Sequence, residues 1–533
     1  MKRSAFKPSL PVSAIGASLL MLACPSPVLA QDAPQADGAA AAQVAVAWDD
    51  ITNVSGATPT FQTVVMPQML PGSPLRKPIL DSMAGLKAKN IRLVPWFTSP
   101  RLSVAQLSPP GPKRTSWDFR NIDSQVIPFL EATKGMEPVL NFSVIPRWMF
   151  KTTGDVTVPA ELDKIIWNYS SASGTGAPVT GGDAGADLVD PSGQQIGDYY
   201  GRVVSWYTKG GFTDEKGVYH KSGHAYTIPW WEVLSELDNG LNVKQYTKLY
   251  DVIVASIKAV SPQTKFTGLN LWCPSESCTP ANIEYFLDPK NHAPGIPIDA
   301  IGYHSYIVPT AEQTAEHWQY TFFQHADQLL DTVRFVEQIK NRLRPEARID
   351  LNEVGCILPG DMMDVGRGAQ GLPPLMKDVP PLYWNACGAY YAYVFAGFAQ
   401  QGIDVVVRKS QLYGYPGQFA TVSMLYPETG RPNARYQVLD LLVRNFRSGD
   451  KLARTTLMSP DVAAQAFVTE GGKRLLLVNK RNRRVSVSLK DVVGQVEMEV
   501  VDPESAGHSP RRTLAEGGEI SLNPFAVAVL AMN

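Results

Sequence analysis

Ile228-Pro-Trp-Trp-Glu-Val-Leu-Ser-Glu-Leu-Asp238 is an apolar stretch that runs directly into acidic residues. Its Trp, Val and Leu residues predict a buried β-strand over residues 228–234. An acid that follows a buried strand of a parallel barrel points into the cleft at the carboxyl ends of the strands. Glu236 is therefore a candidate for chemistry. The alternative is a solvated loop residue or an ion-pair partner.

Short apolar runs and segments of helical periodicity alternate along most of the chain. This alternation predicts parallel α/β architecture, and eight strands with intervening helices fit a (β/α)8 TIM barrel better than an open sheet. The predicted strands are Val44–Trp48, Ile91–Phe97, Pro138–Val144, Ile228–Leu234, Lys265–Leu271, Ile298–Tyr303, Arg348–Asn352 and Ile403–Val407. The predicted helices are Ile79–Lys89, Ile122–Thr133, Ile196–Thr208, Val243–Ser261, Ala311–Leu343, Tyr383–Gln401 and Ala434–Phe446.

Beyond Ser448 the apolar residues alternate with period two, which is typical of strands with one buried face. Two such segments flank Gly471-Gly472 and predict a hairpin with that dipeptide as its turn. The sequence thus predicts a barrel over residues 44–447 and a C-terminal antiparallel β-sandwich over residues 448–533. The second domain either packs against the barrel or binds carbohydrate. Its predicted strands are Gln465–Glu470, Lys473–Lys480, Arg484–Lys490, Val496–Asp502 and Phe525–Met532.

The first thirty residues have the pattern of an export signal: cations, an apolar run over Ala14–Ala23, and a small-residue cleavage site at Val28-Leu29-Ala30. Residues 1–30 are predicted to be the signal peptide, and residues 31–43 a disordered leader. A periplasmic or secreted protein is expected, with lipoprotein anchoring at Cys24 as the rival prediction. No later apolar run approaches the ~20 residues of a membrane helix, so no membrane span is expected.

Charge and cysteine usage exclude several classes of function. The 533 residues hold 49 Lys and Arg against 50 Asp and Glu, which disfavours a nucleic-acid partner. The sequence contains no phosphate-binding glycine motif, and nothing in it points to an oligomeric state. After signal cleavage four cysteines remain, Cys273, Cys278, Cys356 and Cys387. They permit one or two disulfides with Cys273–Cys278 as the obvious local pair, and they lack the spacing of a metal site, so no metal and no cofactor is predicted.

A second acidic strand end is Arg348-Ile-Asp-Leu-Asn-Glu-Val-Gly355, which places Glu353 after an apolar run. Glu236 and Glu353 follow the predicted fourth and seventh strands, which face each other across the mouth of a closed barrel. Two opposed carboxylates can hydrolyse a glycoside, because one donates a proton to the leaving oxygen while the other attacks the anomeric carbon. At the end of the sixth strand, His304 and Tyr306 are candidates to orient a carboxylate or touch a sugar.

These segments resemble the catalytic barrel of clan A glycoside hydrolases, most closely family 39, which includes β-xylosidases, α-L-iduronidases and exopolysaccharide hydrolases. The resemblance implies that Glu236 is the general acid/base and Glu353 the nucleophile of a retaining mechanism. It also matches Arg92 to the arginine that supports the nucleophile, and Tyr306 is a second donor to that carboxylate. The matching segments lie in order between about residues 44 and 447: Asn141–Pro146, Trp231–Asp238, Gln245–Tyr250, Ile257–Pro262, Tyr303–Tyr306 and Leu351–Glu353.

The sequence departs from the clan in two places. Ser235 stands where the clan usually has the Asn that contacts the sugar 2-hydroxyl, so a different or 2-substituted sugar is expected. The eighth strand lacks the usual Trp, and Arg408 or Lys409 there is a candidate to pair with an acidic sugar, or else a surface cation. Trp96, Trp148 and Trp272 are further candidates to stack on sugar faces, with a core position as the alternative for each, and Asn270 is a candidate to hydrogen-bond to sugar hydroxyls.

The leading hypothesis is an exported retaining glycosidase that acts on a polysaccharide or oligosaccharide, without a metal or cofactor. A catalytically silent carbohydrate-binding barrel is the second hypothesis. A hydrolase with Cys356 as its nucleophile is a third, but no motif supplies the histidine base that it needs.

Overall fold

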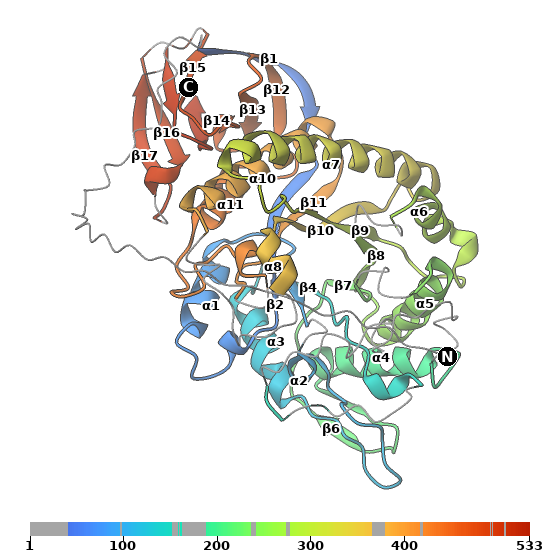
Figure 1. The fold of residues 1–533 in the computed structure, drawn as a ribbon. Coiled ribbons are helices and arrows are strands. Elements are labelled where there is room, and N and C mark those ends of the chain that lie inside the picture. Colours follow the sequence, from blue (N-terminus) through green and yellow to red (C-terminus); the bar gives the residue numbers. More distant parts are fainter. Residues whose placement is uncertain are drawn as a thin grey trace, which may run out of the picture. The chain divides into compact units, whose positions relative to one another are not determined.

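Eight parallel strands close into a barrel (Figure 1). The computed structural model describes residues 41–95, 99–151, 158, 160–162, 188–235, 241–272, 278–364, 379–415, 419–490, 492, 494–505, 508–516 and 518–532. In chain order the barrel strands are β2 (Ala57–Val64), β3 (Arg92–Val94), β4 (Val139–Leu140), β7 (Trp230–Glu232), β8 (Lys265–Trp272), β9 (Ala300–Ile307), β10 (Arg348–Cys356) and β11 (Val405–Lys409). The predicted (β/α)8 fold is therefore confirmed.

The prediction for the first barrel strand was wrong. Val44–Trp48 belongs to β1 (Ala42–Val54), which pairs antiparallel with β12 (Lys451–Met458) and parallel with β15 (Val485–Leu489) of the C-terminal sheet. The first barrel strand is β2, which is almost wholly buried, as barrel strands are on both faces. Its sequence Ala-Thr-Pro-Thr-Phe-Gln-Thr-Val has no continuous apolar run, which concealed it.

The helices that surround the barrel agree closely with their periodicity. Each of the seven predicted helices is present, with shifts of a few residues at the ends. The additional helix α6 (Pro280–Leu287) was not predicted. The main helices are α1 (Arg76–Gly85), α3 (Arg120–Ala132), α4 (Gln194–Thr208), α5 (Val243–Val260), α7 (Ala315–Leu343), α10 (Pro381–Gln401) and α11 (Ala434–Asn445), with short α2 (Pro100–Ser103) and α8 (Pro359–Asp364) in loops. A small hairpin, β5 (Gly211–Thr213) and β6 (Tyr219–Lys221), follows α4.

The C-terminal residues form, together with β1, a nine-stranded sheet with its own apolar core, in the order β17-β16-β19-β14-β13-β12-β1-β15-β18. Apart from the parallel β1–β15 pair, neighbouring strands are antiparallel, as the predicted sandwich requires. The hairpin forms as predicted, but its turn residues are Glu470 and Gly471, because Thr469 pairs with Gly472. The strands not yet bounded are β13 (Val462–Thr469), β14 (Gly472–Asn479), β16 (Gln495–Val501), β17 (Arg511–Glu516), β18 (Ile520–Leu522) and β19 (Val527–Met532).

One face of this sheet packs on the barrel helices α10 and α11. Phe467 of β13 lies 4.4 Å, between ring centroids, from Phe446 at the end of α11, and it stacks on Phe395 of α10. These rings belong to the same core cluster as the barrel. Packing against the barrel is thus one role of the C-terminal domain. Among the described residues, no helix has the length and apolar character needed to cross a bilayer.

Candidate active site

Glu353 lies near the carboxyl end of β10 and is held by side chains from two other strands. Arg92 Nη1 of β3 lies 2.7 Å from Glu353 Oε1, and the Tyr306 hydroxyl of β9 donates to Glu353 Oε2 at 2.5 Å. His304 Nδ1 lies 3.5 Å from the same Oε2. The Glu353 side chain remains 14% exposed, whereas Arg92 is sealed at 0%. The structure therefore brings together four of the predicted site residues around one accessible carboxylate.

The surroundings of Glu353 favour its ionised form. Burial opposes the negative charge, but the neighbouring His304 and Arg92 charges and the Tyr306 hydrogen bond outweigh burial and hold the Glu353 pKa below its ordinary value. A carboxylate in this state is ready to act as a nucleophile.

Glu232 of β7 is a second carboxylate on Arg92 and was missed by the sequence analysis as a site residue. Arg92 Nε donates to Glu232 Oε2 at 2.6 Å, and both side chains are fully buried. Burial opposes the Arg92 charge, but Glu232 and Glu353 outweigh it and raise the Arg92 pKa above its ordinary value. The available signal was a charged residue inside the apolar run Trp230-Trp-Glu-Val-Leu234, because a buried charge requires a partner.

Asn270 is placed differently from the prediction. Its side chain is fully buried inside the barrel, where Nδ2 donates to the Leu234 carbonyl at 3.0 Å and Oδ1 accepts from Asn352 Nδ2 at 2.8 Å. The expected contact with sugar hydroxyls is therefore wrong, since the amide has no exposed surface. Asn141 also donates to the Leu234 carbonyl, at 2.9 Å, and to Glu232.

Arg408 corrects another prediction, because it is neither a surface cation nor placed to meet a substrate. It is fully buried, forms an ion pair with Asp350, and donates from Nε to the Asn90 carbonyl at 3.0 Å. Lys409 faces α10 instead, with Nζ 4.3 Å from the ring centroid of Tyr391. Burial lowers the Lys409 pKa well below its ordinary value. Neither cation can reach an acidic sugar in the cleft.

The remaining predicted site residues fall partly outside the described structure. Glu236 and Trp96 lie outside the described residues, and the side chain of Trp272 is not among those described. Trp148 is half-buried and donates its indole N–H to the Gln106 carbonyl at 2.8 Å. It lines a pocket of about 390 Å³ together with residues of α4. Trp148 therefore remains available for one-sided contact with a ligand.

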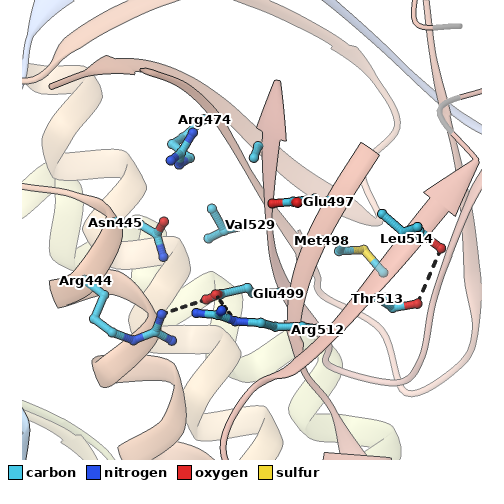
Figure 2. A pocket seen from close by; sticks show the side chains of 11 residues that line it. Arg444, Asn445, Arg474, Glu497, Met498, Glu499, Arg512, Thr513, Leu514 and Val529 are labelled. Atoms are coloured by element: carbon cyan, nitrogen blue, oxygen red, sulfur yellow. Dashed lines mark hydrogen bonds and ion pairs between the residues drawn. The ribbon is translucent and has the colours of Figure 1, made fainter. Parts of the chain in front are cut away.

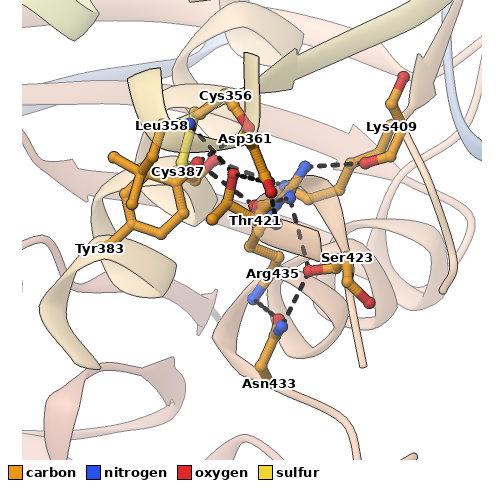
Figure 3. The surroundings of a disulfide bond; sticks show 11 residues. Cys356, Leu358, Asp361, Tyr383, Cys387, Lys409, Thr421, Ser423, Asn433 and Arg435 are labelled. Atoms are coloured by element: carbon orange, nitrogen blue, oxygen red, sulfur yellow. Dashed lines mark hydrogen bonds between the residues drawn. A yellow bond between two sulfur atoms is a disulfide. The ribbon is translucent and has the colours of Figure 1, made fainter. Parts of the chain in front are cut away.

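A disulfide joins the strand of Glu353 to a helix outside the barrel. Cys356 at the end of β10 is bonded to Cys387 of α10, and Figure 3 shows the bond within a buried polar network. The Tyr383 hydroxyl donates to the Cys356 carbonyl at 2.8 Å, and Arg435 Nη1 donates to the Thr421 carbonyl at 3.0 Å. Cys278 is also disulfide-bonded, while Cys273 lies outside the described residues. Cys356 thus has no thiol to serve as a nucleophile.

A pocket in the C-terminal sheet lies away from this site. Its volume is about 570 Å³, and it opens over β14, β16, β17 and β19 beside α11 (Figure 2). Arg444 Nη1 and Arg512 Nε each lie 2.8 Å from a Glu499 oxygen, so its main charges pair with one another. Within the described part of the chain, no cluster of three or more His, Cys, Asp or Glu side chains is arranged to hold a metal ion.

Comparisons with known proteins show where the fold recurs. A family model described as "D-apionate lactonase, C-terminal immunoglobulin-like domain" matches residues 460–530, within the C-terminal sheet. No curated protein matches the sequence. An α-L-arabinofuranosidase from Thermotoga maritima has a TM-score of 0.57 at 13% identity, over 92% of this chain and 99% of that one. A family 51 α-L-arabinofuranosidase from Bifidobacterium longum has a TM-score of 0.57 at 12% identity, over 92% of this chain and 99% of that one. A glucosidase from Croceicoccus marinus has a TM-score of 0.55 at 12% identity, over 92% of this chain and 98% of that one.

These structural likenesses cover the barrel and the C-terminal domain together. At such low identity they establish the fold, a TIM barrel followed by a β-sandwich. The neighbours are named as glycoside hydrolases, whereas membership of family 39 stays a prediction from the sequence.

Proposed function

We propose that this protein is a retaining glycoside hydrolase that acts on an oligosaccharide or polysaccharide. The observation that carries the proposal is Glu353, a partly exposed and ionised carboxylate held by Arg92 and Tyr306 at the carboxyl end of a barrel strand. Catalytic groups of TIM barrels occupy this end of the strands. Structural neighbours named as arabinofuranosidases and a glucosidase support the same reaction class.

In this mechanism Glu353 attacks the anomeric carbon and forms a covalent glycosyl-enzyme. Glu236, which follows the fourth barrel strand in the sequence, donates a proton to the leaving oxygen. It then takes a proton from the water that releases the sugar. Arg92 and Tyr306 keep Glu353 ionised between turnovers. The sugar is expected to differ from that of relatives with Asn before the acid/base, because Ser235 has a shorter side chain.

We also propose that the enzyme works outside the cytoplasm, with residues 1–30 as its export signal. Two features support this location: the charged and apolar pattern of those residues, and the Cys356–Cys387 disulfide, a bond that persists in oxidising compartments. The test is to express the full-length chain and to look for a product that begins at Gln31, by N-terminal sequencing, in the periplasmic or culture-medium fraction.

The test of the reaction is hydrolysis of neutral, uronic-acid-containing and bacterial exopolysaccharides, measured as released reducing ends. Glu236→Gln and Glu353→Gln are the paired variants. We expect cleavage of at least one polymer by the wild type and loss of cleavage in both variants. Binding without cleavage in the wild type would favour a silent carbohydrate-binding barrel instead.

A second candidate function is hydrolysis of a sugar lactone. The family-model match over residues 460–530 favours it, because the matched domain is described as part of a D-apionate lactonase. This match lies in the C-terminal sheet and does not include Glu353. Proton release from aldonolactones at neutral pH, with uncatalysed hydrolysis subtracted, would identify this activity.

A further inference from the structure

The side chains around Glu353 belong to a ring of interactions inside the barrel. Part of this ring consists of asparagine side chains that have no role in the proposed mechanism. One half is ionic and joins Glu353 to Arg92 and Arg92 to Glu232. The other half consists of amides. Asn141 donates to Glu232 and to the Leu234 carbonyl, Asn270 donates to the same carbonyl, and Asn352 donates to Asn270. Because Asn352 precedes Glu353 in the chain, the ring closes on the residue where it began.

The amide half is unusually constrained. Asn141, Asn270 and Asn352 are each fully buried. Leu234 and Asn270 both adopt left-handed backbone, with φ of 58° and 51°. A leucine adopts this conformation only where its surroundings hold it there, and such strain collects at functional sites. The two amides on the Leu234 carbonyl supply that hold.

Gly302 of β9 makes room for the amide pair between β8 and β10. A Cβ atom at this position would lie 2.3 Å from Asn270 Oδ1 and 3.0 Å from Asn352 Nδ2. The strand registers shift beside it, between Leu269 and Leu271 on β8 and between Asp350 and Glu353 on β10. Both shifts lie beside the two amides. The backbones of β8, β9 and β10 therefore all accommodate the hydrogen bond between Asn352 and Asn270.

We infer that Asn270 is a positioning residue, which ties the backbone of Leu234 to the strand of Glu353 from inside the barrel. Leu234 is two residues before Glu236 in the sequence, and Asn352 is one residue before Glu353. A retaining mechanism requires a fixed carboxyl separation of about 5–5.5 Å. The amide chain Leu234–Asn270–Asn352 holds Leu234, from which the sequence continues to Glu236, and its loss is expected to misplace the proposed acid/base. The inference rests on the proposed function.

The test is Asn270→Asp, which keeps the shape and the left-handed preference but replaces the donor to Leu234 with an oxygen. A misplaced acid/base slows substrates that need protonation of the leaving group, and spares those that do not. The probes are phenyl and 2,4-dinitrophenyl glycosides of β-D-xylose and α-L-arabinofuranose, because the 2,4-dinitrophenolate leaves without a proton. We expect kcat/KM to fall at least tenfold more for the phenyl glycoside than for the dinitrophenyl one, with azide restoring turnover of the latter.

Asn352→Ser is the second variant, since it removes the far end of the amide chain with a milder change. Asn479→Asp is the matched control: Asn479 is an equally buried amide of β14 that donates to backbone carbonyls in the C-terminal sheet. Rates are referred to the folded fraction measured by near-ultraviolet circular dichroism. Equal losses on both leaving groups, or the same selectivity in the Asn479 variant, would overturn the positioning role and leave the glycosidase intact. A wild type that cleaves none of the glycosides or polysaccharides would overturn the proposed function and this inference with it.

Discussion

Two buried arginine–carboxylate clusters occupy the same barrel but differ in their access to solvent. Arg408 and Asp350 form a pair in which both side chains are 0% exposed. Arg92 binds the equally buried Glu232 and also Glu353, which is 14% exposed. Asp350 and Glu353 lie on the same strand, β10, with a register shift between them. The difference between them is depth: Glu353 lies nearer the carboxyl end of β10.

This comparison teaches that a buried charge in a barrel is weak evidence for function by itself. A sealed ion pair pays for desolvation about as much as it gains from attraction, and it serves mainly to fix the packing. The Arg92 cluster differs because one of its carboxylates, Glu353, is partly exposed and its pKa is lowered. The sequence pattern of both clusters is similar, an isolated charge in an apolar strand, so only the structure separates them.

The largest expected contrast is in catalysis. Glu353→Gln should lower kcat by about 10⁴-fold or more, because it removes the nucleophile while keeping the shape of the side chain. Asp350→Asn should lower kcat of the folded fraction less than about tenfold, since no substrate reaches this layer. The measurement is turnover of the best substrate from the polysaccharide and aryl-glycoside screens. Comparable losses in the two variants would erase the distinction between the clusters.

For stability we expect the opposite ranking, with Asp350→Asn more damaging than Glu353→Gln. Asp350→Asn leaves the Arg408 charge buried without its partner and should reduce the free energy of unfolding by about 3–5 kcal/mol. The double variant Asp350→Leu/Arg408→Met removes both charges and should recover most of that loss. Glu353→Gln should change stability less than Asp350→Asn. Urea unfolding followed by tryptophan fluorescence gives all three values, and a double variant less stable than Asp350→Asn would contradict the packing role.

The sequence predicted most of the fold because barrel strands are buried on both faces and read as continuous apolar runs. Seven predicted strands lie at or within a few residues of the observed ones. The prediction of the first barrel strand was wrong. The sequence of β2 contains three Thr residues and resembles a half-exposed strand, whereas β1, which belongs to the C-terminal sheet, has the clearer apolar run. Long-range pairing between β1 and β12 has no local signature in the sequence.

The sequence predicted four residues of the candidate site, but it did not reveal how deep in the barrel other strand residues lie. His304, Tyr306 and Glu353 were predicted from their places after apolar runs and Arg92 from the family resemblance, and the four side chains do meet. The predictions for Asn270 and Arg408 were wrong because a shift of two residues along a strand moves a side chain from the open end of the barrel to its buried interior. Register depends on bulges such as that beside Asn270, which the sequence does not reveal.

A further contrast concerns the covalent tie on the shared strand. The Cys356–Cys387 disulfide closes a segment with a sequence separation of 31 residues, so the double variant Cys356→Ala/Cys387→Ala should lose about 2–4 kcal/mol of stability. The acidic limb of the pH–rate profile should stay in place, because Glu353 keeps its three partners. Thermal unfolding and a pH profile of the same preparation check both statements. A shifted limb would mean that the disulfide tunes the carboxylate as well as the fold.

The smallest and most specific effect is expected from Tyr306→Phe. The nucleophile must be ionised, so activity falls as the pH drops through the Glu353 pKa. The Tyr306 hydroxyl, 2.5 Å from Oε2, is one of the groups that hold this pKa below its ordinary value. Its removal should raise the Glu353 pKa and move the acidic limb of kcat/KM to higher pH, because the ionised carboxylate loses one hydrogen bond.

Tyr303→Phe is the matched control for that measurement, since Tyr303 is a buried tyrosine of the same strand β9 without a contact to Glu353 among the described interactions. Its acidic limb should coincide with that of the wild type. A limb that moves to lower pH in Tyr306→Phe, or moves equally in both variants, would show that the hydroxyl does not stabilise the ionised carboxylate. The ionised state of Glu353 would then depend on Arg92 and His304 alone. Glu353 would in that respect be closer to Asp350, whose partner is Arg408.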